Sequence, residues 1–239
     1  MQQLPLPIAL PETPRLARFI AGPNAAAVAC LRELAEGRGE RQVLLWSNGR
    51  HGKSYLLRAL CNEVTGRGGA VEALALEAAG ADAPARLRPL GQGGAALVAL
   101  DDIQAITGEP AAEEALFHLI NRCRDAGIPL AMTARRAPAE LGCRLPDLHS
   151  RLLWGPVFRL HPLGDADLAR FLRERAAARG LDMPAEVADY LLLRCRRDPA
   201  YLQALVERLD HAALARQRRL TVPLAREVLA AAQDGAGSR

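Results

Sequence analysis

The sequence predicts an α/β domain in three layers, with a parallel sheet between helices, followed by a small all-helical domain. Short apolar runs alternate with segments able to form helices as far as about residue 160, and only helical periodicity follows. Strands that alternate with helices are typical of a parallel sheet covered on both faces. In addition, a glycine-containing loop joins one strand to one helix, which is the setting of a phosphate-binding loop, or P-loop.

The elements of the first domain follow from the spacing of apolar residues. Val28, Leu31 and Leu34 predict a helix over 24–35, which ends in a glycine-rich turn. Residues 42–46 are apolar and branched, so we predict a strand there and a helix after the loop that follows it. Further strands are predicted at 71–76, 96–100, 130–133 and 157–160, and a further helix at 111–125.

The second domain shows only helical spacing. Leu168, Phe171 and Leu172 share one face of a segment at 165–179, and Leu205 with Leu209 repeats the pattern. Thr221 and Pro223 resemble the start of a last helix. We therefore predict four parts: an extended, proline-rich tail at 1–14, an α/β domain at 15–162, a helical lid domain at 163–233 and a flexible tail at 234–239.

Composition limits the kind of protein. The chain has 239 residues, of which 50% are hydrophobic and 24% charged, as in ordinary globular proteins. Its formal charge of +4 is a weak indication of nucleic-acid contact. The five cysteines form no CxxC pair, which disfavours a disulfide framework and a zinc site. Without a signal peptide or a membrane-length apolar run, we expect a cytoplasmic protein with no membrane partner.

The clearest motif lies between the strand at 42–46 and the next helix. It reads Ser47-Asn48-Gly49-Arg50-His51-Gly52-Lys53-Ser54, a Walker A loop with serine in place of its first glycine. Backbone N–H groups of such a loop cradle phosphates. We expect Lys53 to reach the β and γ phosphates and Ser54 to hold Mg²⁺.

Lys53 is also the only lysine, since arginine occupies every other basic position. A tight phosphate site accepts the compact ammonium of lysine more readily than a broad guanidinium. The alternative interpretation is a lysine that falls in a loop by chance.

A second motif follows about fifty residues later. The apolar run Leu97-Val98-Ala99-Leu100 ends in two carboxylates, Asp101 and Asp102, which is the Walker B arrangement. We expect Asp101 to bind Mg²⁺, directly or through water, and Asp102 to orient the attacking water. The alternative is an acidic helix N-cap after a buried strand.

With these motifs in place, the chain resembles the AAA+ module of the bacterial replication initiator DnaA from about residue 15 to 233. The resemblance rests on Phe19-Ile20-Ala21-Gly22-Pro23-Asn24, Asp101-Asp102-Ile103-Gln104, Ser150-Arg151-Leu152-Leu153-Trp154-Gly155 and the helical end. It implies an AAA+ fold whose nucleotide-binding residues are Ile20, Gly22, Asn48, Gly49, Arg50, His51, Gly52, Lys53, Ser54 and Tyr55. DnaA continues into a DNA-binding domain, and we expect none after Arg239.

Such a module preceded by Gln3-Leu4-Pro5-Leu6-Pro7-Ile8 is similar to the Hda family of DnaA-related regulators. In that family a short tail binds the DNA polymerase sliding clamp, which implies that Gln3, Leu4, Leu6 and Ile8 contact the clamp. A proline-stiffened peptide loses little entropy on binding and presents its apolar side chains to a groove. The alternative is a tail that packs on its own domain.

The resemblance also gives roles to single residues. Arg151 takes the position of an arginine finger, which acts in trans on the phosphates of a neighbouring site. The alternative is a surface arginine that pairs with a helix end. Thr133 takes the sensor 1 position, although a strand-end threonine with no catalytic role is an alternative. Trp154 is expected to pack.

One position departs from the DnaA pattern. Ala200 stands where the sensor 2 arginine is expected, which removes a contact to the γ-phosphate. This departure argues against self-sufficient ATP hydrolysis and favours ADP as a bound ligand, with Arg196 or Arg197 as open substitutes.

We therefore expect a regulator of replication initiation that holds ADP, or ATP, with Mg²⁺ and is tethered to the sliding clamp. It would promote hydrolysis of DnaA-bound ATP, so that it is more an activator than an enzyme. Contact with DNA would be indirect, through the clamp, and homo-oligomerisation is left open. The alternatives are a self-sufficient AAA+ ATPase, a DNA-binding initiator-like factor and a small-molecule P-loop kinase.

Overall fold

The computed structural model describes residues 13–234, with the side chains of residues 13–231. Its contacts divide the described chain into two compact units, and each is described by itself. The α/β unit comprises residues 13–19, Ala26–Trp46 and Lys53–Phe158, and the helical unit comprises Ile20–Ala25, Ser47–Gly52 and residues 159–234.

A five-stranded sheet with the order β2-β3-β4-β1-β5 forms the centre of the α/β unit. Its strands are β1 (Gln42–Trp46), β2 (Val71–Ala75), β3 (Leu97–Asp101), β4 (Leu130–Ala134) and β5 (Val157–Arg159). The pairs β1–β4, β2–β3 and β3–β4 are parallel. Because Ala75 lies opposite Asp101 and Leu45 opposite Thr133, the predicted catalytic positions fall at the carboxyl edge of the sheet.

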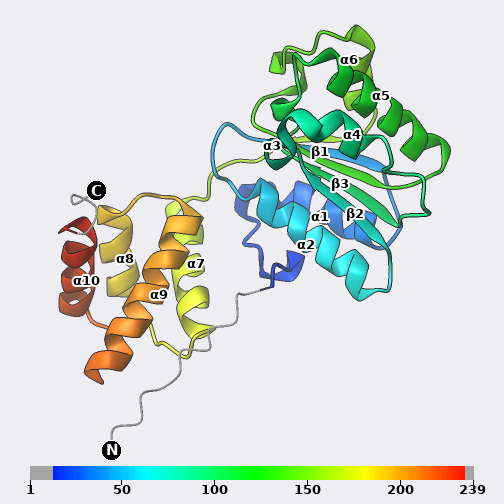
Figure 1. Ribbon diagram of the computed structural model, residues 1–239. Helices are drawn as coiled ribbons and strands as arrows, with labels where there is room; N and C mark the ends of the chain where they lie inside the picture. The colour runs from blue at the N-terminus through cyan, green and yellow to red at the C-terminus, as the bar shows by residue number, and fades with distance from the viewer. Residues whose placement is uncertain (1–12, 235–239) are drawn as a thin grey trace, which may run out of the picture. The chain divides into compact units, whose positions relative to one another are not determined.

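Helices cover this sheet on both faces, and Figure 1 shows α1 and α2 on one face and α4 and α5 on the other. The α/β unit contains α1 (Ala25–Ala35, whose first residue groups with the helical unit), α2 (Lys53–Gly66), α3 (Leu76–Ala79), α4 (Ala83–Leu87), α5 (Pro110–Asp125) and α6 (Pro146–Leu152). In α5, Ala112, Leu116, Leu119 and Cys123 are buried at helical spacing and pack into the core that contains the strands.

The helical unit has a separate apolar core. It contains α7 (Asp165–Ala177), α8 (Ala185–Arg194), α9 (Pro199–Arg216) and α10 (Val222–Asp234). Leu172, Leu191 and Leu209 are buried within it, and α9 begins at an N-cap, Asp198, which accepts the backbone N–H of Ala200. Within the described residues, no helix is long and apolar enough to cross a membrane.

These observations confirm the predicted fold class, an α/β parallel-sheet domain with a helical lid. Two short segments, Ile20–Ala25 and Ser47–Gly52, belong to the helical unit by their contacts. The sequence predicted both within the α/β domain at 15–162. The predicted domain boundaries therefore remain predictions.

Candidate functional site

Lys53 begins α2 as one of the few buried charged residues, with only 9% of its surface exposed. Burial lowers the pKa of its ammonium group below the ordinary value, whereas the charges of Asp102 and Asp101 oppose that shift. Arg135 adds to the lowering through like-charge repulsion. The predicted phosphate-binding lysine and both Walker B carboxylates are thus close enough to interact in one polar cluster.

Thr133 ties the two carboxylate residues together. It is fully buried on β4, beside β3, and its hydroxyl donates to Oδ1 of Asp101. The same oxygen, Oγ1, accepts the backbone N–H of Asp102 at 2.9 Å. The threonine at the predicted sensor 1 position therefore fixes one Walker B side chain and the backbone of the other.

Asp102 has a left-handed backbone, with φ of 61°, which is uncommon outside glycine although aspartate tolerates it. Its Oδ1 accepts a hydrogen bond from Nε2 of Gln104 at 2.8 Å and lies 3.6 Å from Nε of Arg135. Arg135 also pairs with Glu77, at 2.7 Å between Nη2 and Oε2. Neither Gln104 nor Arg135 could be predicted as a partner of Asp102; the signal in the sequence was their position two residues after Asp102 and Thr133.

The predicted loop residues that precede Lys53 belong to the helical unit. Ser47, which replaces the first glycine, is 1% exposed, and its hydroxyl donates to the Gly49 carbonyl at 2.9 Å. Nδ1 of His51 donates to the Leu160 carbonyl at 3.1 Å, and Gly52 has a φ of 93° that favours glycine. Asn48 and Arg50 are exposed.

The remaining predicted nucleotide-binding residues contact protein groups. Ile20 is buried in the apolar core of the helical unit, and a Cβ on Gly22 would lie 2.5 Å from Oδ2 of Asp167. In the α/β unit, the hydroxyl of Tyr55 donates to the Arg15 carbonyl at 3.3 Å. Ser54 is half-buried in the first turn of α2.

A second candidate functional site of the α/β unit surrounds Arg151, which lies in the last turn of α6. Its Nε donates to Oδ1 of Asn121 at 3.1 Å, and its guanidinium carbon lies 4.0 Å from the Trp154 ring centroid and 5.4 Å from that of Phe117. Trp154 packs as expected and also carries Arg124 at 3.9 Å. In the part of the chain that the structure describes, no carboxylate pairs with Arg151.

Two side chains, Glu113 and Gln42, position the helix that carries Arg151. Glu113 is 0% exposed and accepts backbone N–H groups from Gly108, Arg144 and Leu145 at 2.7–3.0 Å, which anchors the chain just before α6. At the other end, Nε2 of Gln42 donates to the Arg151 carbonyl at 2.8 Å.

Gly155 approaches the backbone of β1 closely. A Cβ at this position would overlap the Gln42 carbonyl oxygen, so only glycine fits here without a shift of the chain.

Comparisons with known proteins agree with both units. The family model described as the Hda lid domain matches residues 165–229. Domain III of the Thermotoga maritima replication initiation protein DnaA is similar with a TM-score of 0.80 and 21% identity, over 92% of this chain and 97% of that one. Residues 165–229 thus match the Hda lid domain, and the chain shares the fold of DnaA domain III. The resemblance predicted from the sequence is confirmed at this level.

Two further structures are similar at lower scores. The AMPPCP-bound DnaA from Aquifex aeolicus gives a TM-score of 0.72 at 22% identity, over 83% of this chain and 65% of that one. The Thermotoga maritima RuvB Holliday junction branch migration motor gives 0.65 at 18% identity, over 87% and 67%. At these identities the likeness shows the fold alone, and this chain spans about two thirds of the length of these two proteins.

In the helical unit, Ala200 lies in the first turn of α9 and is exposed. The two arginines left open as substitutes for sensor 2 have partners within the lid. Arg196 lies 4.6 Å from the Tyr201 ring, and Arg197 pairs with Asp165 at 3.1 Å. The predicted clamp contacts at Gln3, Leu4, Leu6 and Ile8 lie outside the described residues.

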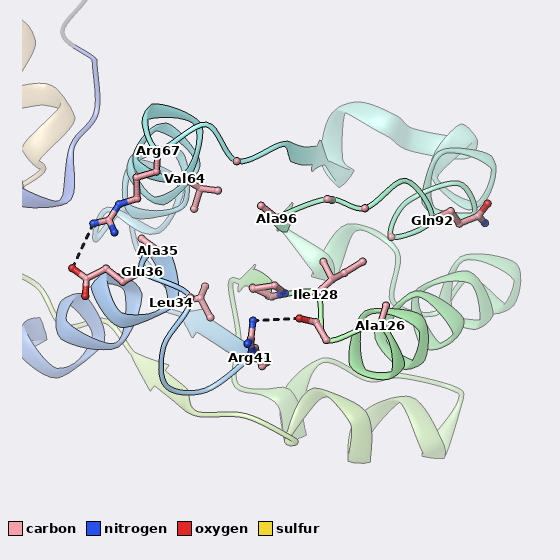
Figure 2. A pocket seen from close by; sticks show the side chains of 17 residues that line it. Leu34, Ala35, Glu36, Arg41, Val64, Arg67, Gln92, Ala96, Ala126 and Ile128 are labelled. Carbon is pink, nitrogen blue, oxygen red and sulfur yellow. Dashed lines mark hydrogen bonds and ion pairs between the residues drawn. The ribbon is translucent and has the colours of Figure 1, made fainter.

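A cavity of about 630 Å³ lies at the other edge of the sheet (Figure 2). It is lined by residues that precede the strands, among them Arg41, Ala96 and Ile128. Figure 2 also shows Arg67 paired with Glu36 at its rim. Ligands of open α/β sheets bind at the carboxyl ends of the strands, so this cavity is not the expected nucleotide site.

Proposed function

We propose that this AAA+ chain regulates replication initiation by promoting hydrolysis of DnaA-bound ATP while it holds ADP itself and is tethered to the sliding clamp. The observation that carries the proposal is the environment of Arg151. Its side chain is held by an amide and two aromatic rings, and no carboxylate in the described residues neutralises it. A cation held in this way is suited to act on a phosphate of another molecule.

Nucleotide binding is supported by the cluster around Lys53 and by the relatives, since DnaA structures contain AMPPCP. Burial disfavours the charged form of Lys53, and the negative charge of a bound phosphate would stabilise that form. The Ser54 hydroxyl and the Asp101 carboxylate are oxygen donors of the kind that Mg²⁺ prefers together with phosphates. The absence of an arginine at Ala200 favours ADP over ATP as the resident nucleotide.

Arg151 would supply charge to the transition state of phosphoryl transfer on DnaA. Arginine fingers stabilise the charge that develops on the transferred phosphoryl group and increase the rate about 10³- to 10⁵-fold. The fork of the guanidinium contacts two oxygens at once, which a lysine cannot do. The hydrogen bond that Arg151 donates to Asn121 and the stacking on Trp154 limit the conformations of the side chain before the partner arrives.

The test is phosphate release from labelled ATP preloaded on DnaA, at saturating clamp on DNA. We expect Arg151→Ala to lose nearly all of the stimulation, Arg151→Lys to recover little of it, and both to bind ADP as the native protein does. Arg124→Ala is the matched control, because Arg124 also stacks on Trp154 and should leave stimulation intact. Full stimulation by Arg151→Ala would reject the trans-acting role.

The same assay tests the tether. Changing Leu4 and Leu6 together to alanine should abolish the dependence of stimulation on the clamp and remove clamp binding, because buried apolar anchors dominate such interfaces. Continued copurification of this double variant with the clamp would show that the tail is not the tether.

A second function is a self-sufficient AAA+ ATPase that acts as a loader or remodeller. One observation favours it: Lys53, Asp101, Asp102 and Thr133 are brought together at the carboxyl edge of the sheet, as a hydrolytic site requires. Steady-state ATP turnover by the isolated protein distinguishes the two functions, since an activator of DnaA needs no rapid turnover of its own.

A further inference from the structure

The carboxylate of Asp102 already has partners within the α/β unit. Its Oδ1 accepts the hydrogen bond from Gln104 Nε2 at 2.8 Å and faces Arg135 Nε at 3.6 Å. The same guanidinium is held at its other end by Glu77, with Nη2 and Oε2 2.7 Å apart. Arg135 therefore bridges two carboxylates, and one of them is the residue expected to orient water.

The backbone reinforces this arrangement. Gln104 accepts the backbone N–H of Arg135 at 2.9 Å through Oε1 while its Nε2 donates to Asp102, so a single amide joins the two residues of the pair. Asp102 itself has a φ of 61° and donates its N–H to Thr133. A non-glycine residue persists in this conformation where its surroundings determine it. Gln104 and Arg135 thus contact the Asp102 carboxylate, and Thr133 fixes the Asp102 backbone.

We propose that Arg135, with Gln104, holds Asp102 in an arrangement that restrains this chain's own ATP hydrolysis. The inference rests on the proposed nucleotide binding. In the reaction, the oxygen of water bonds to the γ-phosphorus while the bond from that phosphorus to the bridging oxygen breaks. ATP and water give ADP, inorganic phosphate and a proton released to solvent. A carboxylate orients this water through an oxygen that is able to accept from it, and Oδ1 of Asp102 already accepts from Gln104 and faces Arg135.

The size of the effect follows from the exposure of the pair. The side chain of Arg135 is 54% exposed and that of Asp102 19% exposed, so solvent screens their attraction. Pairs of this kind contribute at most about 1 kcal/mol, which corresponds to about fivefold in an equilibrium constant. Arg135 is a positioning residue, and its removal should raise turnover by about that factor.

The first experiment measures steady-state ATP turnover and calorimetric ADP affinity for Arg135→Ala. Arg136→Ala is the matched control, because Arg136 is the exposed next residue and its loss changes the net charge equally. We expect kcat to rise about fivefold for Arg135→Ala and to stay unchanged for Arg136→Ala, while the ADP affinities of the two variants agree within about threefold. Arg135→Lys should give an intermediate kcat, since a point charge cannot bridge both carboxylates.

Three results would overturn the proposal: an unchanged kcat, a lower kcat, or an ADP affinity about tenfold weaker than that of Arg136→Ala, which would make Arg135 a phosphate ligand instead. A native protein that binds neither ADP nor an ATP analogue would contradict the proposed nucleotide binding, which is a different failure.

A second readout needs no nucleotide. In the nitrogen NMR spectrum of the free protein, the Arg135 Nε–H resonance should shift when Asp102→Asn removes the charge, and the Arg136 resonance should not. If the Arg135 resonance does not shift in Asp102→Asn, the pair between Arg135 and Asp102 does not form, and the proposal fails independently of the measured kcat.

Discussion

Arg135 and Arg151 have opposite electrostatic environments in the same α/β unit. Arg135 is bridged between Glu77 and Asp102, so its positive charge is compensated within the chain. Arg151 is held by Asn121 and two aromatic rings, which fix its position without adding negative charge. The difference teaches that the partners of an arginine determine what its charge can do. Carboxylate partners neutralise the charge within the chain, whereas an amide and aromatic rings leave it able to attract an anion of another molecule.

The largest effect is expected for Lys53, the predicted phosphate-binding lysine, whose charge interacts with those of Asp102 and Arg135. Lys53→Ala should weaken ADP binding about 30-fold or more, because removing one partner of a buried charge pair costs about 2–5 kcal/mol. Isothermal calorimetry measures the change directly, and native affinity in this variant would remove Lys53 from the nucleotide site.

Lys53→Met provides a control for folding. Because burial disfavours the ammonium form in the free protein, this substitution should leave stability unchanged or raise it by up to about 2 kcal/mol while ADP binding is still lost. Denaturant unfolding without nucleotide checks this expectation. A strongly destabilised Lys53→Met would mean that the lysine supports the fold.

A smaller effect is expected when Arg151 is given an environment like that of Arg135. Asn121→Asp keeps the shape of the side chain and places a carboxylate where the amide oxygen now accepts from Nε at 3.1 Å. The stimulation of DnaA hydrolysis should fall about fivefold, the equivalent of about 1 kcal/mol spent on breaking the new pair.

Asn62→Asp, an exposed substitution of equal charge on α2, is the control for Asn121→Asp. If Asn121→Asp stimulates as well as the native protein, the lack of a carboxylate beside Arg151 has no functional meaning.

The smallest effect concerns the lid. Ala200 stands in place of a sensor 2 arginine, and Arg197 is paired with Asp165. We therefore expect ADP to bind at least as tightly as ATP, with dissociation constants that differ by no more than about threefold. Competition between ADP and a non-hydrolysable ATP analogue measures the ratio. A strong preference for the analogue would mean that another cation contacts the γ-phosphate.

The fold could be predicted because its signals are local. The strand predicted at 42–46 is observed at Gln42–Trp46, and the helix predicted at 111–125 is observed at Pro110–Asp125. Periodicity and strand-end carboxylates depend only on near neighbours in the sequence. The same logic located Asp101, Asp102 and Thr133 at strand ends.

The partners of the two arginines could not be predicted in the same way. Arg135 meets Glu77 across 58 residues, and Arg151 meets Asn121 across 30, so that no local pattern connects them. Glu113 is a further example, since a carboxylate in the first turn of an amphipathic helix gives no sign that it is 0% exposed and accepts three backbone N–H groups. Such contacts arise only once the chain is packed.

The close approach of Gly155 to Gln42 has a consequence for how this sequence can vary. Any side chain at position 155 would push the segment after α6 away from the edge of β1, and Gln42 is also the residue that binds the Arg151 carbonyl. A mutational library over 150–155 should therefore accept many residues at the exposed Leu153 and reject nearly all at 155. Rejected variants would keep Arg151 unchanged but displace it, so the proposed stimulation of DnaA hydrolysis should be lost although no reactive group is altered.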